Sequence, residues 1–551
     1  MGSGGTDAAG EGADRSVRRV SARAAGVVAL AVMCSRVLGL VREQVFGHLF
    51  GTTWQMDAFK MAFRIPNLLR DLFAEGALST AFVTTFSRTA EGEGLESAWG
   101  LANRVTTFAV VVLSGLTLLG IAFSDGLVSL VAEGFTGEKL ALTVYLTRLM
   151  FPFILLVSVA AVVMGILNAR SVFGVPAMAS TFFNIVSIVG GLGIGWWMDP
   201  TFGTRSLTGF AVGTLLGGLA QWLVQVPSLR GVGYRFSWDF RWRDPAMRRF
   251  LSVLGPALVA ASAVQVNVMV NAQFASYQGD GAVSWLDFAF RLMQLPLGLF
   301  GVAIGTVALP SVSRSAEAGD LVGVRGILAH GLRLAAVLTV PATVGLWFLA
   351  EPLVALLYQH GAFDAESTRR TADALQYYAV GLAAYSGIKV ISPAFYALDR
   401  RMMPMVVAFG AIATNALLNW SFLRWTGLGH RGLALATGLV ATLNFTVLYR
   451  MMRGLLGGME TRGLAVTVGK CVLSSVAMVV GLLVYAWVFG RRLGSGAEGV
   501  LVVRALVLIG AIGFGAAVFW ATALMLRLRE VTELSSGLMR RLRRGRSTGG
   551  A

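Results

Sequence analysis

The chain has 551 residues, of which 56% are hydrophobic and only 14% are charged, and its mean hydropathy is +0.70. Soluble globular proteins carry about 25% charged residues, so this composition excludes that class and indicates an integral membrane protein. The net charge of +17 comes from basic residues scattered through short loops and the C-terminal tail. This scatter excludes a compact nucleic-acid-binding domain and is typical of loops that face anionic lipid.

Apolar runs of about 20 residues, separated by short polar connections, recur along the chain. A β-barrel would alternate at every second residue, so the pattern predicts an all-α integral membrane protein with about 14 transmembrane helices. The expected spans are 24–48, 56–87, 98–123, 140–168, 176–198, 207–228, 247–276, 282–312, 322–349, 372–397, 403–424, 431–453, 464–489 and 499–526. Basic residues concentrate in alternate connections, which predicts that both termini are cytoplasmic.

The second and eighth spans contain an internal repeat. Phe63 and Arg64 in FRIPNLLRDLF match Phe290 and Arg291 in FRLMQLPLGLF at a constant offset of 227 residues. Six spans separate the two copies, and an even number preserves their orientation, so we predict two parallel six-helix lobes. The expected parts are a disordered cytoplasmic leader (1–23), an N-lobe (24–228), a basic cytoplasmic linker (229–246), a C-lobe (247–453), two further helices (454–526) and a basic cytoplasmic tail (527–551).

A ladder of polar residues runs along the second span. Its members recur at spacings of three and four, which places them on one face of a helix: Asp57, Lys60, Arg64, Asn67, Asp71 and Glu75. A charge at membrane depth costs about 2.5 to 3.5 kcal/mol and is usually tolerated where it faces water. The ladder therefore predicts the wall of a hydrophilic chamber, although arginines that snorkel to the membrane surface are the alternative for any single position.

Arginines from three spans would line this chamber: Arg36, Arg42, Arg64, Arg70 and Arg291. A guanidinium group binds phosphate in a planar, bidentate manner and stays charged in a poorly solvated site. The pattern indicates an anionic, phosphorylated substrate. The alternative is that Glu43, Asp57, Asp71 and Glu75 pair with these arginines only to lock the helices together.

Glycine and proline residues suggest positions where helices bend, and two asparagines suggest a cation site. Gly39, Pro66, Glu75 and Pro296 are the expected gating or hinge positions, because proline and glycine free backbone bonds or permit a bend. Asn415 and Asn419 lie four apart on one face of the eleventh span and form a candidate cation site, although hydrogen bonds between helices are the commoner use of such amides. No enzyme constellation and no cysteine or histidine cluster with metal-ligand spacing is present in the sequence.

The segment SRVLGLVREQVFGHLFGTTWQMDAFKMAFRIPNLLRDLFAEGALSTAFV, together with RLMQLPLGLFGVAIGTVALPSVSR, closely resembles the MurJ (MviN) lipid II flippase family of the multidrug/oligosaccharidyl-lipid/polysaccharide exporter superfamily. The resemblance covers essentially the whole chain. It implies transport of the lipid-linked peptidoglycan precursor from the inner to the outer leaflet of the bacterial cytoplasmic membrane by alternating access. No enzymatic activity and no cofactor are implied; the energy source is the membrane potential or a coupling cation, Na⁺ or H⁺.

The family's essential arginines match Arg36, Arg42, Arg70 and Arg291, and its essential aspartate matches Asp57. The implied partners are lipid II and the membrane, with cell-wall synthesis proteins as further candidates, and the chain is expected to be a monomer. The two C-terminal spans are expected to form a groove for the lipid tail.

The sequence also departs from the family pattern. Phe290 and Gln294 stand where relatives carry acidic residues, so we expect no local charge pair at Arg291. Lys60 adds a charge, and Asn415 and Asn419 replace the aspartates that bind sodium in some relatives. The alternative functions are a multidrug or organic-cation exporter of the same superfamily, which should present carboxylates to its cavity, and a non-transporting membrane scaffold.

Overall fold

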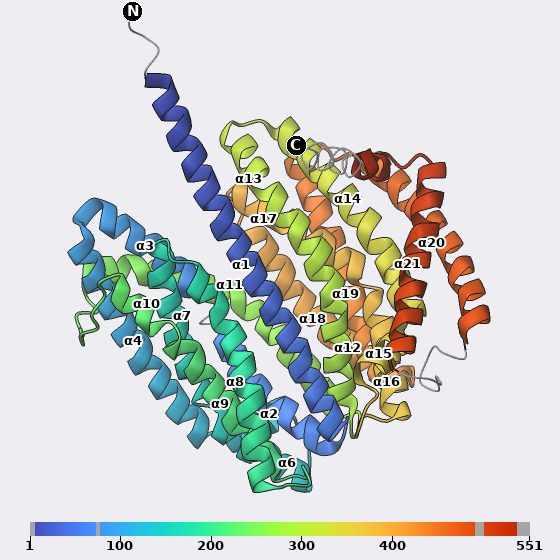
Figure 1. Cartoon of the computed structure of the whole chain (residues 1–551), viewed down its shortest axis with the longest axis horizontal. Coiled ribbons are helices and arrows are strands. Elements are labelled where there is room, and N and C mark those ends of the chain that lie inside the picture. The colour runs from blue at the N-terminus through green and yellow to red at the C-terminus, as the bar shows by residue number, and fades with distance from the viewer. Residues whose placement is uncertain (1–5, 73–77, 491–500, 537–551) are drawn as a thin grey trace, which may run out of the picture. The chain divides into compact units, whose positions relative to one another are not determined.

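The computed structural model describes residues 6–72, 78–490 and 501–536 (Figure 1). Within these ranges every regular element is a helix, which confirms the predicted all-α class. Contacts divide the chain into two compact units. The first comprises Met1–Phe50 and Trp54–Gln265, and the second comprises Gly51–Thr53 and Val266–Ala551.

The helices of the first unit are α1 (Thr6–Phe50), α2 (Trp54–Leu72), α3 (Leu78–Glu93), α4 (Leu95–Ala122), α5 (Ser124–Val131), α6 (Gly137–Met150), α7 (Phe153–Ala169), α8 (Gly174–Met198), α9 (Ser206–Leu223) and α10 (Val226–Gly231). Helix α11 (Pro245–Ser276) begins in the first unit and ends in the second.

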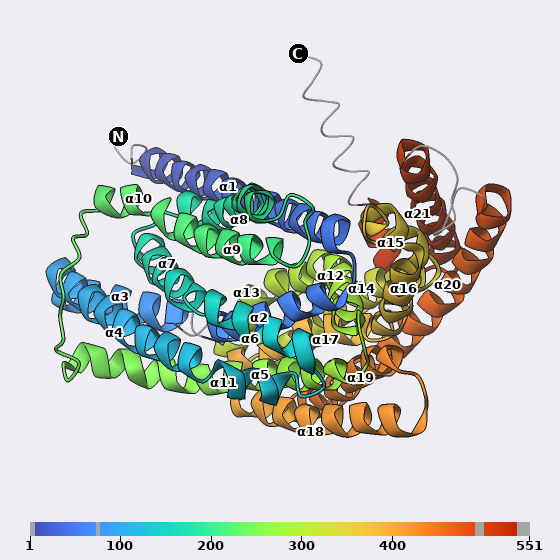
Figure 2. The same cartoon turned by 90° about the horizontal axis from the view of Figure 1, so that it is seen from below.

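The second unit continues with α12 (Ala282–Pro296), the π-helix η2 (Leu297–Val302), α13 (Ala303–Glu317), α14 (Leu321–Phe348), α15 (Ala350–Tyr358), α16 (Ala365–Ala379), α17 (Leu382–Ala397), α18 (Met402–Trp425), α19 (His430–Leu455), α20 (Thr461–Phe489) and α21 (Leu501–Met525). Helices α20 and α21 pack side by side, as both views show (Figures 1 and 2).

Eleven helical segments of the described chain are long and apolar enough to cross a membrane. Each coincides with one of the expected spans. The other three expected spans coincide with α1, with α2 and α3, and with α16 and α17. Helices α2 and α16 are more polar because they carry charged residues along one face. The chain is therefore a multi-span membrane protein, and its helices agree with the expected plan.

The internal repeat extends through most of both units. Adding 227 to the bounds of α4 gives 322–349, and α14 spans Leu321–Phe348. The same shift carries α8 to 401–425, and α18 spans Met402–Trp425. The helix positions in the structure thus support the two related six-helix lobes that one short sequence motif predicted.

Two boundaries differ from the expected ones. Helix α1 begins at Thr6, so residues 6–23, expected to form a disordered leader, continue the helix. A helix nucleated in an apolar segment adds one hydrogen bond per residue, and Ala, Arg and Glu favour its extension. The expected linker 229–246 does not separate the units; the division falls within α11, between Gln265 and Val266.

The α8–α9 hairpin of the first unit packs through glycine (Figures 1 and 2). A Cβ atom on Gly209 would lie 2.3 Å from the backbone nitrogen of Gly195, and one on Gly213 would lie 2.4 Å from that of Gly191. No side chain fits at these two points, because the backbones themselves are in contact.

The two candidate hinge prolines behave differently. Pro66 lies within helix α2, and Pro296 lies where α12 ends and the π-helix η2 begins. The role of both prolines as hinges stays a prediction. A Cβ on Gly305 would lie 2.4 Å from the carbonyl oxygen of Lys389, so the chain just after η2 also runs close to α17.

Candidate functional site

Helix α2 carries the polar ladder of the first unit. Its first turn contains Asp57 and its last turn contains Arg70. The negative charge therefore lies at the positive N-terminal end of the helix dipole and the positive charge at its negative C-terminal end, which stabilises the helix. Asp57 is fully buried, and its carboxylate lies 2.9 Å from the Nζ atom of Lys139 at the start of α6. A pair this deeply buried fixes α2 against α6, since removing either partner would strand a charge in a dry environment.

A second buried pair joins α1 to α2. Glu43, whose side chain is only 2% exposed, accepts a hydrogen bond from Lys60. Arg42 lies 3.6 Å from the same carboxylate and stacks over the ring of Phe183, 5.2 Å from its centroid. The additional charge of Lys60 is thus balanced inside the unit, and Glu43 holds both cations in position.

The last turn of α2 is more accessible. Arg70 lies 2.6 Å from Asp71, and the two side chains are 20% and 25% exposed. Asn67 donates a longer hydrogen bond of 3.4 Å to the same carboxylate. Arg64 is half-buried one turn earlier, whereas Arg36 is exposed on α1 and makes no ion pair within the described residues. These groups can reach an external anion without breaking the buried pairs.

Arg291 stands on α12 in the second unit and is 37% exposed. Its Nε atom lies 3.4 Å from Asp287, one turn earlier on the same helix. The expectation that Arg291 lacks a local charge pair is therefore wrong. The sequence held the necessary signal, because Asp287 precedes Arg291 by four residues, the spacing of a helical ion pair.

The predicted arginines thus form two groups. Arg36, Arg42, Arg64 and Arg70 belong to α1 and α2 of the first unit, and Arg291 belongs to the second. Sequence analysis missed Lys139, whose pairing with Asp57 spans 82 residues and leaves no local signal. The gating position Glu75 lies outside the described residues. Gly39 lies within the unbroken helix α1.

The candidate cation site is an amide cluster in the second unit, which we define as Asn267, Asn271, Asn415 and Asn419. Asn415 donates to Asn267 at 2.9 Å and to Asn271 at 2.8 Å, and Asn419 donates to Asn271 at 2.9 Å. Both Asn415 and Asn419 are fully buried, and their carbonyl oxygens accept no hydrogen bond from a described residue. Two such oxygens suit a hard cation, although amides alone supply no charge to retain it.

Comparison with known proteins decides the family. The family model described as "Lipid II flippase MurJ" matches residues 46–507, which is most of the chain. The chain belongs to the MurJ family. It is 36% identical over 428 residues to the lipid II flippase MurJ of Burkholderia cenocepacia, covering 76% of this chain and 81% of that protein. It is 32% identical over 514 residues to the probable lipid II flippase MurJ of Vibrio cholerae, covering 91% of this chain and 95% of the relative.

Solved structures agree with the MurJ fold. A structure described as lipid II flippase MurJ in an inward closed conformation aligns with a TM-score of 0.73 at 24% identity, covering 90% of this chain and 99% of that chain. An inward-facing multidrug resistance MATE transporter of the MOP superfamily aligns with a TM-score of 0.68 at 16% identity, covering 78% and 98%. At these identities the likeness concerns the fold alone, and the MurJ assignment rests on the sequence relatives.

Proposed function

We propose that this chain moves lipid II, the undecaprenyl-pyrophosphate-linked disaccharide-pentapeptide, from the inner to the outer leaflet of the bacterial cytoplasmic membrane by alternating access. Membership of the MurJ family, shown by the match over residues 46–507, is the observation that carries the proposal. The accessible arginines of α1, α2 and α12 supply the chemistry that a pyrophosphate requires.

Two arginines are already paired with a neighbouring carboxylate. Arg70 and Asp71 are adjacent in sequence, and Arg291 pairs with Asp287 one turn away. Both pairs are partly exposed, so a pyrophosphate can replace the carboxylate without exposing an isolated charge to the membrane. Arg36 would add a contact from α1, and Arg64 and Asn67 would add contacts from α2. Arg42, which is 13% exposed and held at Glu43, would contribute its charge from within that pair.

Asp57 has a structural role in this proposal, unlike the arginines that would bind the substrate. Its carboxylate is fully buried against Lys139, so we assign it to positioning α2 rather than to contact with the substrate. The alternative interpretation of the ladder, helix locking, thus fits the buried pairs, whereas substrate binding fits the accessible ones.

The membrane potential can drive the transfer. An interior-negative potential favours outward movement of an anion by about 2.3 kcal/mol per charge per 100 mV. The lipid tail would stay in the membrane throughout, beside α20 and α21. The polar headgroup alone would cross through the protein.

The test measures which leaflet exposes lipid II in cells depleted of their own flippase and supplied with this chain. We expect wild type to restore outer-leaflet lipid II and Arg70→Ala to fail, with both proteins present in the membrane. Arg88→Ala is the matched control, because Arg88 is exposed on α3 and lies outside the proposed site. Restoration by Arg70→Ala would reject the arginine site, and failure of wild type would favour an exporter, to be examined by drug efflux.

Coupling to a cation is a separate part of the proposal, based on the amide cluster. We expect NaCl to raise the thermal unfolding midpoint of the purified chain relative to choline chloride at equal ionic strength. Asn415→Leu should remove this difference, because it deletes one of the two buried carbonyl oxygens. Equal midpoints for wild type in the two salts would leave the membrane potential or a proton gradient as the energy source.

A further inference from the structure

The connection between α10 and α11, residues 232–244, forms a strap across helix α4. Asn103 donates to Ser237 at 2.9 Å, and Thr107 accepts a hydrogen bond of 3.1 Å from the backbone of Asp239. Arg104 lies 3.1 Å from Asp239 and 2.5 Å from Asp244. These contacts explain why the strap stays with the first unit.

Aromatic residues alternate with the polar ones along the strap. Phe236, Trp238 and Phe240 occupy every second position and are exposed, whereas Ser237 and Asp239 between them contact α4. Trp238 is 59% exposed and Phe240 is 61% exposed, and their rings stack with centroids 6.1 Å apart. Exposed aromatic rings of this kind are enriched at the interface between membrane and water.

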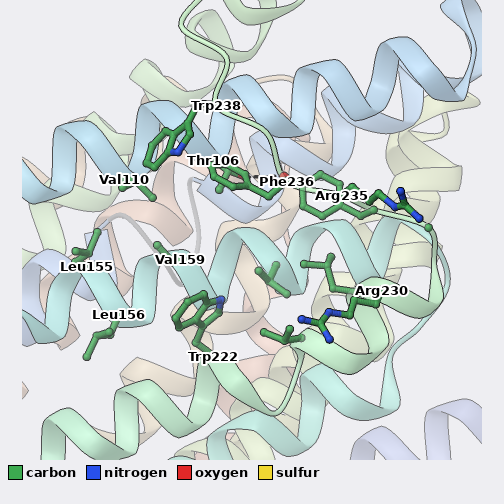
Figure 3. Close-up of a pocket in the computed structure, with 15 residues that line it drawn as sticks. Thr106, Val110, Leu155, Leu156, Val159, Trp222, Arg230, Arg235, Phe236 and Trp238 are labelled. Atoms are coloured by element: carbon green, nitrogen blue, oxygen red, sulfur yellow. Dashed lines mark hydrogen bonds between the residues drawn. The ribbon is translucent and has the colours of Figure 1, made fainter.

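A cavity of about 920 Å³ lies beneath the strap. Its wall is formed by α4, α7, the end of α9, α10 and the strap itself. Figure 3 shows that the cavity has two chemically different ends. Val110, Leu155 and Leu156 line one end, and Arg230 and Arg235 line the other. The volume is typical of ligand pockets, which span about 300 to 1,000 Å³.

Arg230 and Arg235 are exposed arginines at the polar end of the cavity. Neither Arg230 nor Arg235 makes an ion pair within the described part of the chain. The nearby acids are already used, since Asp239 contacts Arg104 and Arg241, and Asp244 contacts Arg104. Hydrogen bonds from Arg241 hold the pKa of Asp239 well below its usual range, so this acid remains charged and committed to its partners.

We propose that this cavity binds one anionic phospholipid from the leaflet that the strap faces. Arg230 and Arg235 would hold its phosphate, an acyl chain would lie between α4 and α7, and the aromatic strap would cover the glycerol region. Charge complementarity favours an anionic over a zwitterionic lipid, because two guanidinium groups that make no ion pair within the described residues attract a headgroup with net negative charge. A free phosphate ion would leave the apolar end unfilled.

This site lies within the first unit and uses none of the residues proposed to hold the transported substrate. The inference therefore stands independently of the proposed transport function, and its test needs no transport assay.

Native mass spectrometry of the full chain in detergent provides the test, with phosphatidylglycerol and phosphatidylcholine of identical acyl chains as probes. We expect one tightly bound phosphatidylglycerol and much weaker binding of phosphatidylcholine. Replacing both arginines, Arg230→Gln with Arg235→Gln, should weaken phosphatidylglycerol binding roughly tenfold or more, given the usual contribution of each basic residue to lipid binding. The matched control is Arg243→Gln with Arg248→Gln, which removes two exposed arginines that do not line the cavity.

A second variant tests the apolar end. Val159→Phe would fill the cavity between its two ends without changing charge, and we expect it to weaken binding of phosphatidylglycerol as well. Equal binding of the two lipids, undiminished binding to the double arginine variant, or equal loss in the control would overturn the proposal. Displacement of the lipid by excess inorganic phosphate would also overturn it, because it would identify an anion site without an acyl-chain component.

Discussion

The two repeats place helices at equivalent positions but join them through different contacts. In the first unit α8 and α9 meet backbone to backbone at Gly191 and Gly213, and the ring of Phe210 packs 5.2 Å from that of Phe46 on α1. In the second unit the position 227 residues after Phe210 is Thr437, which accepts a hydrogen bond from Asn271. There α11 and α18 are joined through the amide cluster.

This difference separates a rigid glycine contact between α8 and α9 from an adjustable amide contact between α11 and α18. Backbones in direct contact cannot rotate past one another, because no side chain can move aside. Amide groups can exchange hydrogen-bond partners, and such bonds between membrane helices contribute only about 0.6 kcal/mol on average. We infer that the α8–α9 contact is the stiffer of the two. The substitutions below test this contrast, from the largest expected effect to the smallest.

Removing the buried carboxylate of α2 should have the largest effect. Asp57→Ala leaves Lys139 as an uncompensated charge, and we expect a loss of about 3 to 5 kcal/mol in the free energy of unfolding. The equivalent residue of the second repeat, 227 positions later, is Ser284, which is fully buried but neutral. Ser284→Ala should cost about 1 kcal/mol. Reversible unfolding in detergent measures both, and equal losses would contradict a special role for the ion pair.

The glycine contact comes next. Gly213→Ala places a methyl group 2.4 Å from the backbone of Gly191, so we expect overpacking to destabilise the chain by about 1 to 3 kcal/mol. Gly193→Ala is the control, because the same methyl group on α8 would meet no atom within 4 Å. The control should be neutral or slightly stabilising, since alanine favours a helix over glycine. Unfolding midpoints that fall equally for both variants would argue against a close-packed hairpin.

The amide cluster should give a smaller loss. Asn271→Ala removes the acceptor for both Asn415 and Asn419, which leaves buried donors unsatisfied at a cost of about 1 to 2 kcal/mol. We also expect faster hydrogen exchange in α18 and unchanged exchange in α8, measured by mass spectrometry on the same sample. Faster exchange in both α18 and α8 would contradict the independence of the two contacts.

The strap gives the smallest effect and depends on pH. It has no counterpart in the second repeat, where Gly331 occupies the position equivalent to Arg104. Because the Arg241 hydrogen bond lowers the pKa of Asp239, the ionised carboxylate stabilises the fold above its unfolded pKa of about 3.9. Asp239→Asn should therefore cost about 1 kcal/mol between pH 5 and 8. This difference from wild type should shrink below about pH 4, as thermal unfolding at several pH values can determine.

Local patterns account for what the sequence predicted. The spans follow from hydropathy, and the repeat follows from a constant offset between Arg64 and Arg291, so both are readable without tertiary contacts. The polar face of α2 follows from helical spacing alone. Asp287 could have been assigned to Arg291 in the same way.

Contacts between distant segments account for what it did not predict. Arg104 and Asp239 are separated by 135 residues, and neither lies in a pattern that indicates the other. The same holds for Asp57 and Lys139. The polar, glycine-rich composition of residues 6–23 predicted disorder, but these residues are helical because α1 continues into them. Pro66 lies inside α2, where a membrane helix tolerates one lost backbone bond when its neighbours are packed around it.

The π-helix η2 has a consequence for the direction in which side chains point. Each residue of an α-helix turns the chain by about 100°, so moving the wide π turn along the chain by one residue would rotate the residues that it passes by about that angle. The main chain of α12 could remain in place while this happened. A six-residue segment next to Arg291 can therefore act as a rotary element, which converts a one-residue change of hydrogen-bond register into a large change in which side chains face a neighbour.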